Sequence, residues 1–520
     1  MEDDEIGRDT VEAADAADSA PRPQAAASLT PSPGPTGHER RPREQPVDSV
    51  LVAPVSRGLS TFARLAPVVI ATVYLSATVL LLASGLWPWP IHQPFRLYGY
   101  LVLANVLLVA GYVTAAFRAP RVYGARWSHE SVFWACATVT VLVLPLTSYA
   151  RTGSWYPDAV AGLRDPGSAY NQTLNLRASA ELIEYVRIVL AVPLTLLLPL
   201  TVYTWTGMST LTRVAAVTGI GGYLAVYVAM GTNKVLADVA VVVCILGIAA
   251  AIAGGAAITR RAALRLAVIG AVVMAMMLTF FSVGQFTREG GLAVARTVDT
   301  THINWSSPAR PPEAQQREVL ARGAAYNSYR RGQQDPRSGL VTARLDHWLV
   351  QNLPSSVGSS IIALAGYLTQ GYYGLSLAME EPYVPTYGLG SSHFLVRNGA
   401  RLLGAPEFHD RPYPMRVETH RGWDAYGVWS SFYAWAASDL TFPGVLVAML
   451  LVGRLLALTW LDTLEGSNPF AIGSFALAFL MVIYLPANNQ IFGSGEAAVG
   501  FVGLITLWLF TRRRSSQAAG

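Results

Sequence analysis

Both the fold and the chemistry of this chain centre on the stretch YPMRVETHRGWDAYGVWSSFYAWAASDLTFPG, which runs from Tyr413 to Gly444. It closes a long polar segment, residues 286–441, which is set between strongly apolar runs. Five of the eight histidines lie in this segment: His302, His347, His393, His409 and His420. We therefore expect the chemistry here, and we expect the remaining chain to hold this segment at a membrane face.

The composition indicates a polytopic membrane protein. Hydrophobic residues make up 52% of the 520 residues and charged residues only 14%, whereas a soluble domain usually carries about 25% charged residues. The basic residues are nearly all arginine, because Lys234 is the only lysine, and we infer no nucleic-acid partner from the net charge of +5. The two cysteines, Cys136 and Cys244, lie inside apolar runs and give little information on the redox compartment.

Ten apolar runs are candidates to cross a membrane as helices, since about 20 apolar residues span the hydrocarbon core. Seven precede the polar segment and three follow it: 62–85, 97–117, 131–149, 182–204, 211–230, 236–254, 264–285, 442–461, 470–486 and 494–511. The expected fold class is an all-α polytopic membrane protein with about ten transmembrane helices and a large extracytoplasmic segment.

Arginine clusters predict the orientation. They follow the second, sixth and last runs, and all of them face the cytoplasm if the N-terminus is cytoplasmic, as the positive-inside rule expects: Arg118, Arg121, Arg126, Arg260, Arg261, Arg265 and Arg512 to Arg514. We expect the cytoplasmic (inner) cell membrane, with both termini cytoplasmic. Four regions result: a disordered tail, a bundle of seven helices, an extracytoplasmic catalytic and substrate-binding segment, and C-terminal helices with a basic tail, at 1–60, 61–285, 286–441 and 442–520.

An uncharged apolar run, 353–379, lies inside the extracytoplasmic segment. The chain enters and leaves this segment on the same side, so the run cannot cross the membrane once. We expect a re-entrant or interfacial helix, or one half of a pair with 424–440. Re-entrant backbone at membrane depth usually lines a cavity, which favours a site nearby.

Ionisable residues cluster at the outer ends of several runs. Glu184 and Arg187 open the fourth, Lys234 and Asp238 open the sixth, and Glu496 opens the last. Charges in membrane segments are costly and often functional. The alternative is local pairing, because Glu184 with Arg187 and Lys234 with Asp238 have the spacing of neighbours on a helix.

The polar segment offers arginines for an anionic lipid-linked substrate. A planar guanidinium matches the oxygens of a phosphate or pyrophosphate, and lysine supplies a point charge. The candidates nearest the quoted stretch are Arg411, Arg416 and Arg421. Most arginines of the segment are expected to be solvated loop charges, with two or three touching a ligand.

Candidate bases follow in the same stretch. Histidine and carboxylates are the usual general bases for a sugar hydroxyl, and His420, Glu418 and Asp424 lie within seven residues. A zinc site is a competing interpretation, but the spacing of metal ligands is missing. The other alternative is a polar loop with incidental histidines. The aromatics from Trp423 onward either anchor an interfacial helix or stack on sugar rings.

Three tracts carry a resemblance to a known family. Residues 366–390, GYLTQGYYGLSLAMEEPYVPTYGLG, hold a Tyr-x-x-x-Gly-Tyr pattern before a Tyr-Gly-x-Gly turn, residues 423–444 form an aromatic tract ending in Asp439 and Gly444, and GTNK ends at Lys234. In this order they resemble bacterial oligosaccharide repeat-unit polymerases of the Wzy type, where arginine is more usual than lysine in the last motif. The resemblance covers roughly residues 210–510.

The resemblance implies glycosyl transfer at the outer face of the membrane. The donor would be a glycan on polyprenyl pyrophosphate and the acceptor a lipid-linked repeat unit, with no cofactor or metal. His420 would be the base, with Glu418 or Asp424 as substitutes, and Lys234, Arg416 and Arg421 would stabilise the leaving pyrophosphate. Substrate contacts are expected from Lys234, Arg187, Arg411, Arg416, Arg421, Tyr367 and Trp423. Besides the bilayer, a chain-length regulator and a flippase are candidate partners.

Other functions fit the same features. A ligase that moves the glycan to another acceptor, or a glycosyltransferase that uses a polyprenyl-phosphate sugar, would need the same lipid chemistry. A lipid-linked glycan flippase or other transporter is a different class. Transporters often show two related halves, whereas the predicted helices divide seven and three, which disfavours a transporter. A scaffold in a glycan assembly complex is the last alternative.

Overall fold

The computed structural model describes residues 60–118, 127–176, 181–232, 234–254, 297–299, 340–425 and 430–512. All of them belong to one compact unit, Leu51–Gly520. The predicted tail, up to residue 59, and the predicted helix 264–285 lie outside the described residues, as does most of the region 286–339.

Helices dominate the described part of the chain, and six of them are long and apolar enough to cross a membrane. These candidate spans are α1 (Thr61–Ala83), α2 (Pro94–Ala116), α3 (His129–Thr152), α8 (Thr210–Ala229), α9 (Lys234–Ala253) and α16 (Phe432–Glu465). They indicate a membrane-embedded protein, which confirms the coarse prediction from composition.

A bent pair of helices adds a seventh span if it is counted as one. It consists of α6 (Glu181–Val189) and α7 (Ala191–Thr204), continued by the 3-10 helix η3 (Trp205–Gly207), and the two parts bend by 56°. Pro193 explains the break, because its ring clashes with the carbonyl four residues earlier, which belongs to Val189. The last two predicted runs form shorter apolar helices, α17 (Pro469–Tyr484) and α18 (Gly495–Thr511).

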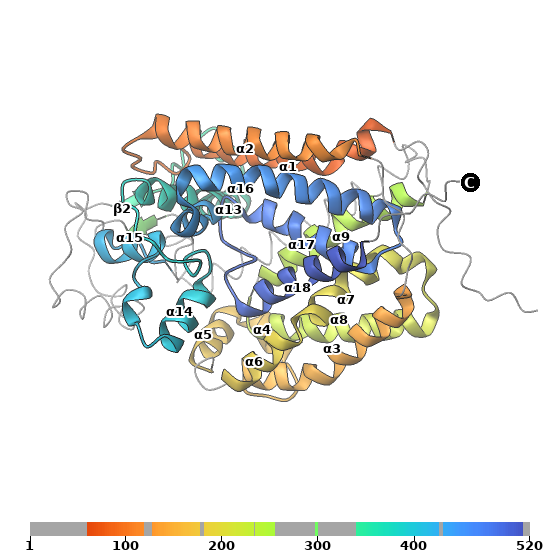
Figure 1. Ribbon diagram of the computed structural model, residues 1–520. Coiled ribbons are helices and arrows are strands. Elements are labelled where there is room, and N and C mark those ends of the chain that lie inside the picture. The colour runs from red at the N-terminus through yellow and green to blue at the C-terminus, as the bar shows by residue number, and fades with distance from the viewer. Residues whose placement is uncertain are drawn as a thin grey trace, which may run out of the picture. The chain divides into compact units, whose positions relative to one another are not determined.

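Helices α1, α2 and α16 run side by side in Figure 1. Glycine makes the contact between α2 and α16 close: a Cβ atom on Gly111 would lie 1.9 Å from the Leu450 carbonyl oxygen, and one on Gly453 would lie 1.9 Å from that of Leu108. Small residues allow this approach in membrane bundles, where packing rather than hydrophobic burial joins helices. A larger side chain at either position would force the two helices apart.

Helix α16 is broken near its beginning by an unusual backbone conformation. Thr441 has φ 64° and ψ 165°, a region that a β-branched residue rarely adopts, at a cost of about 1–3 kcal/mol. Pro443 follows, and it cannot donate the amide hydrogen bond that a continuous helix needs. The segment before Thr441 is therefore a separate short helix, which takes up much of the predicted 424–440 partner.

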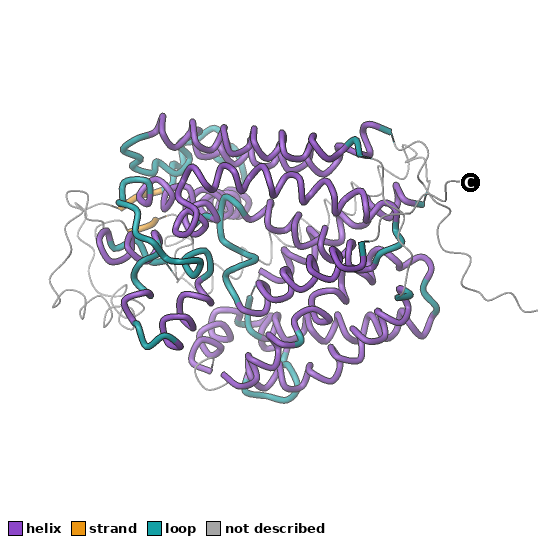
Figure 2. The backbone as a smooth tube through the Cα atoms, viewed as in Figure 1, coloured by secondary structure: helices purple, strands orange, loops and turns teal. Residues whose placement is uncertain are grey.

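Helices α13, α14 and α15 lie at one end of α1, α2 and α16, near the small sheet in Figure 1. The predicted apolar run 353–379 forms α13, and loops join these elements (Figure 2). The bounds are α4 (Ala159–Arg164), α5 (Pro166–Leu176), α13 (Ser355–Ala378), α14 (His393–Leu402), the 3-10 helix η4 (Pro406–Phe408) and α15 (Tyr413–Arg421). Strands β1 (Thr297–Asp299) and β2 (Leu340–Thr342) pair antiparallel, with Val298 opposite Val341.

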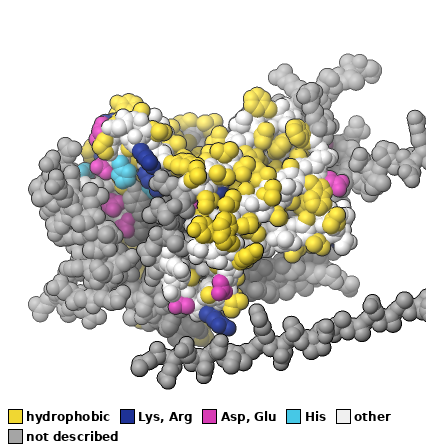
Figure 3. All heavy atoms as spheres, turned by 90° about the horizontal axis from the view of Figure 1, so that it is seen from below, with side chains coloured by type: hydrophobic (Ala, Val, Ile, Leu, Met, Phe, Trp, Pro, Cys, Tyr) yellow, Lys and Arg dark blue, Asp and Glu magenta, His cyan; other side chains and the backbone are white. Residues whose placement is uncertain are grey.

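The outer surface of the long helices is apolar. Exposed aliphatic side chains such as Val73, Leu80, Leu142 and Leu211 point away from the core. Figure 3 shows hydrophobic side chains over much of one face, with the charged ones toward its margins. A bilayer would cover such a face, because soluble monomers rarely expose contiguous apolar patches of this kind.

Candidate functional site

Helix α15 carries the centre of the candidate site, and its limits follow from the sequence. The helix begins after Pro412, where the backbone N–H of Tyr413 donates to the Ser438 hydroxyl at 2.9 Å. It ends at Gly422, whose φ of 75° suits the left-handed cap and whose N–H donates to the Glu418 carbonyl at 2.8 Å. Nine residues thus present His420, Arg416 and Arg421 from one short, capped helix.

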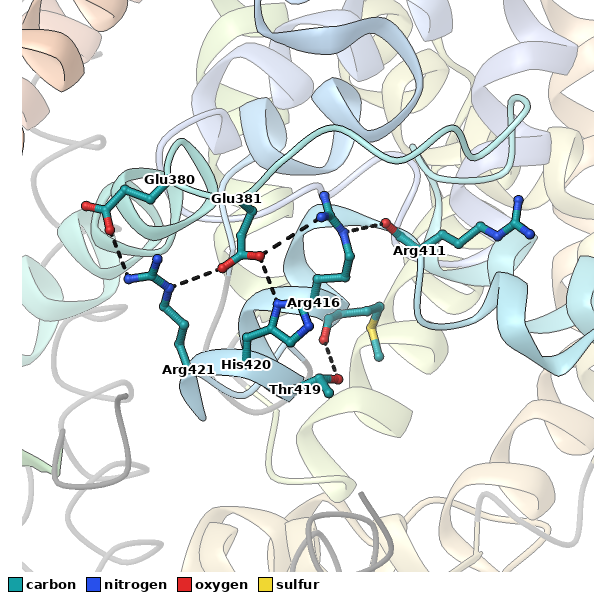
Figure 4. Close-up of polar contacts among 8 residues, drawn as sticks. Glu380, Glu381, Arg411, Arg416, Thr419, His420 and Arg421 are labelled. Atoms are coloured by element: carbon teal, nitrogen blue, oxygen red, sulfur yellow. Dashed lines mark hydrogen bonds and ion pairs between the residues drawn. The ribbon is translucent and has the colours of Figure 1, made fainter. Parts of the chain in front are cut away.

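Glu381, just beyond α13, is the hub of the site (Figure 4). One of its oxygens, Oε2, lies 2.9 Å from Nδ1 of His420 and 4.0 Å from Nη1 of Arg416, and the other accepts from Nε of Arg421 at 3.1 Å. The Glu381 side chain is fully buried. Burial alone would raise the pKa of Glu381, but the hydrogen bonds and charges of His420 and Arg421 hold it below its ordinary value.

The preceding residue, Glu380, extends this network. Arg421 donates from Nη1 to Glu380 at 2.9 Å, so one guanidinium bridges two successive carboxylates. His92, from the loop between α1 and α2, lies 3.5 Å from the other oxygen of Glu380. Arg421 is buried, and its contacts with Glu380 and Glu381 fix α15 against the end of α13.

Arg416 and Arg411 are placed differently from Arg421. Arg416 is buried, donates from Nε to the Arg411 carbonyl at 2.9 Å and stacks 4.7 Å from the centre of the Tyr413 ring. Burial lowers the pKa of the Arg416 guanidinium below its ordinary value, against the charge of Glu381. Arg411 lies 4.0 Å over the ring of Phe408 and donates to a backbone carbonyl. Arg416 therefore faces the carboxylate of Glu381, whereas Arg411 faces an aromatic ring.

Glu418 is a further titratable group of α15, two residues before His420. Its carboxylate accepts from the Ala425 N–H at 3.2 Å, just past the end of the helix. Burial, then the negative charge of Asp424, raise the pKa of Glu418 to about 7. A carboxyl group that exchanges its proton near neutral pH is suited to acid–base work.

Trp423 belongs to a buried aromatic stack rather than to an exposed surface. Its ring meets Trp89 edge-on at 6.0 Å and Tyr373 edge-on at 4.8 Å. Trp89 stacks on Tyr373 at 5.1 Å and on Trp87 at 5.4 Å. The stack joins the α1–α2 loop, α13 and the residues after α15, so Trp423 holds the site in place. Tyr367, also predicted to contact substrate, is half-buried on α13.

Arg187 lies outside this network, in the bent pair. It is fully buried on α6 and forms an ion pair with Glu496 of α18 at 2.5 Å, while Glu184 pairs with Arg151 of α3 at 2.9 Å. Glu184 and Arg187 thus have their ion-pair partners on other helices, and the local attraction considered as the alternative acts in addition to them. Among the described residues nothing accepts a hydrogen bond from Nε or Nη1 of Arg187.

Lys234 is the first residue of α9, and its side chain is exposed. Its charge acts on Asp238, one turn later in the same helix, as the local alternative expects. The Asp238 carboxylate also accepts from the Gln490 side chain at 2.9 Å. Lys234 thus lies at the start of a candidate span, where a charged side chain can reach the membrane surface.

Glu380 and Glu381 were missed by sequence reasoning. They end the apolar run as Met379-Glu380-Glu381-Pro382, within the tract that carries the family resemblance. Two acids after a membrane-like run indicate, by themselves, the point where the chain returns to water. Buried charges require partners. Two adjacent carboxylates and the several arginines of the following stretch therefore could have predicted ion pairs between them.

Comparison with known proteins gave no match: no family model, no curated protein and no solved structure matches the chain. Within the described part of the chain, no three His, Cys, Asp or Glu side chains are grouped to hold a metal ion. The candidate site therefore depends on its own geometry.

Proposed function

We propose that this protein is a membrane glycosyltransferase that polymerises lipid-linked oligosaccharide repeat units, with His420 as the general base. The observation that carries the proposal is the contact between Nδ1 of His420 and the buried carboxylate of Glu381. A carboxylate at one ring nitrogen fixes the tautomer and orientation of the imidazole, and it stabilises the positive charge that forms when the other nitrogen takes a proton. The base would take the proton of the acceptor hydroxyl as the glycosidic bond forms.

The surroundings of this pair suit the rest of such a reaction. The leaving group would be a polyprenyl pyrophosphate, whose growing negative charge needs fixed cations. Arg411 is held by aromatic and carbonyl contacts. Arg411 is the proposed pyrophosphate ligand, and exposed Lys234 would meet the lipid phosphate at the surface. Arg187, fully buried and paired with Glu496, would join two helices instead. Arg421 has a different role, because both Glu380 and Glu381 neutralise it.

Topology is part of the same proposal. The site would lie on the outer face of the cytoplasmic membrane, with about ten spans and both termini inside. Helix α13 would be the re-entrant or interfacial element beneath it, since the carboxylates that α15 needs follow directly after it. The candidate partners stay as predicted: the bilayer, the lipid-linked glycan, a flippase and a chain-length regulator.

A genetic experiment tests the proposal. The gene is deleted in its host, and surface glycans are separated on a gel after complementation with the wild type, His420→Ala or Lys234→Ala. The deletion and His420→Ala strains should leave single repeat units on the surface acceptor, and Lys234→Ala should shorten the chains. Thr419→Ala is a matched control, because Thr419 neighbours His420 and its hydroxyl bonds a carbonyl of its own helix.

Three outcomes would redirect the proposal. Normal chain length in the deletion strain would exclude polymerisation. Loss of all surface repeats, with lipid-linked units held inside, would indicate a flippase. Complete repeat polymers that stay on the lipid carrier would indicate a ligase. Orientation is tested separately by labelling single cysteines, Asp410→Cys and Arg512→Cys, from outside intact cells.

A further inference from the structure

The loop between α13 and α14 is held by a single carboxylate, that of Asp439. Its Oδ1 accepts from the Thr386 hydroxyl at 2.5 Å and from the backbone N–H groups of Gly388 and Gly390 at 2.8 and 3.1 Å. Its Oδ2 accepts from both the N–H and the hydroxyl of Ser391 at 2.6 Å. Five donors converge on one side chain, whose two oxygens offer about four lone-pair sites.

Ser438, the residue before Asp439, holds the start of α15. The Ser438 hydroxyl accepts from the backbone N–H of Tyr413, the first residue of α15, at 2.9 Å, and the Ser438 carbonyl shares the Thr386 hydroxyl at 2.6 Å. The loop leads back in five residues to Glu381, and α15 ends with His420 and Arg421. The two partners of the proposed catalytic pair are thus tied to successive residues of α16.

Ser438 and Asp439 directly precede the break in α16 at Thr441. Pro443 cannot donate to the Asp439 carbonyl, and the hydroxyl of Tyr383 donates to that carbonyl instead at 3.4 Å. Thr441 holds a backbone conformation that favours glycine, so the kink is opposed by local backbone strain. The hydrogen bonds of Asp439 therefore stabilise the kink, and the backbone strain at Thr441 destabilises it.

We propose that Asp439 is a positioning residue: it keeps α16 kinked against the strain at Thr441 and so sets the distance between Glu381 and His420. Its effect on activity rests on the proposed function, while its effect on the kink does not. Weakening the Asp439 contacts should let the 386–391 loop and α15 move relative to α16. Removing the strain at Thr441 should offset that change, because glycine accepts the kinked backbone and disfavours a straight helix.

Distance measurement between spin labels tests the kink. Labels are placed at exposed Tyr387→Cys in the loop and exposed Val447→Cys in α16, after replacing the two native cysteines, Cys136 and Cys244, by alanine. Asp439→Asn should broaden the distance distribution at least twofold, and adding Thr441→Gly should return it to the wild-type width. Asp346→Asn, which removes an exposed carboxylate from the same segment, should leave it unchanged.

Activity of the same proteins tests the positioning role. With purified protein and lipid-linked repeat units, Asp439→Asn should lower kcat at least tenfold with KM within threefold, and Thr441→Gly should restore most of it. If Asp439→Asn does not yield folded protein, Ser391→Ala, which removes one of the five donors, is used instead and should give a smaller change of the same sign. Unchanged distances in the Asp439 variant, or no recovery with Thr441→Gly, would overturn the proposal. Distances that respond while even the wild type lacks glycosyl transfer would uphold the kink and reject the proposed reaction.

Discussion

Two buried arginines illustrate different uses of an ion pair in this protein. Arg187 joins α6 to α18 through a single carboxylate, that of Glu496. Arg421 instead shares two carboxylates, Glu380 and Glu381, with two histidines and a second arginine. The first contact connects two membrane helices and leaves two donors without acceptors in the described part of the chain. The second is a shared network around His420, the proposed general base.

The difference between a single ion pair and a shared network indicates which contact affects stability and which affects activity. A one-to-one buried pair is costly to break, because the surviving charge has no compensation, but an apolar pair can often replace it. A shared network resists such replacement, since each member orients another. The comparison predicts that changes at Glu381 act mainly on activity and that changes at Glu496 act mainly on stability.

The largest expected effect is at Glu381. Glu381→Gln keeps the size of the side chain but removes the charge that supports His420 as the proposed base. The proposed glycosyl transfer should therefore fall about 10²–10⁴-fold, the usual contribution of general-base catalysis. The measurement is polymer formation by purified protein. Glu380→Gln is the matched control and should lose far less, because Glu380 pairs with Arg421 and His92. Activity within threefold of wild type in Glu381→Gln would contradict the assignment.

The next effect is at the pair between α6 and α18. Glu496→Leu should lower the free energy of unfolding by about 3–5 kcal/mol, since it leaves the buried charge of Arg187 without its carboxylate. The double variant Arg187→Met with Glu496→Leu should regain most of this stability, and thermal unfolding in detergent measures both. A double variant as unstable as the single one would show that the pair is not the source of the loss.

A smaller effect concerns pH and Glu418. Its pKa in the folded protein is about 7, above the ordinary 4.5, so folding favours the protonated form. The resulting stabilisation is complete below about pH 4.5 and is lost as the pH rises through 7. Allowing for solvent screening, we expect about 1–2 kcal/mol. The melting temperature of the wild type should therefore fall between pH 5 and 8, and Glu418→Gln should flatten that slope. An identical slope in the variant would refute the shift.

The smallest effect is at Arg411, which packs on Phe408 and donates to the Pro385 carbonyl. An exposed cation–π contact contributes about 0.5–1 kcal/mol, so Arg411→Met should change stability by no more than that. If Arg411 binds the pyrophosphate, Arg411→Met should raise KM for the lipid-linked substrate, and Arg411→Lys should recover part of it. An unchanged KM in Arg411→Met would remove Arg411 from the substrate site.

Local sequence patterns predicted the candidate spans but not the partners within the site. Long apolar runs predicted α1, α2, α3 and α8 because about twenty apolar residues form a helix in a bilayer whatever lies beside them. The partners of charged residues depend instead on which helices meet. Arg187 and Glu496 are 309 residues apart, and His420 and Glu381 are 39 apart. Spacing rules for one helix could not find these pairs.

The break in α16 shows the same limit. Pro443 was visible in the sequence, and a helix was expected to begin near it. A helix does begin there, after the kink at Thr441, but a separate helical segment from Phe432 leads directly into it. Threonine is a residue type that gives no warning of a positive φ. The contacts of Asp439 with a distant loop oppose the strain of that conformation, so local propensity alone could not predict it.

The aromatic stack beside α15 gives the protein an optical reporter of its own. Trp87, Trp89 and Trp423 approach one another around Tyr373 at ring distances of 4.8–6.0 Å. Excitation passes readily between indole rings so close together, and their emission depends on how the rings are spaced. Any movement that separates the end of α15 from the α1–α2 loop would therefore alter the intrinsic fluorescence, without a label and in an intact membrane.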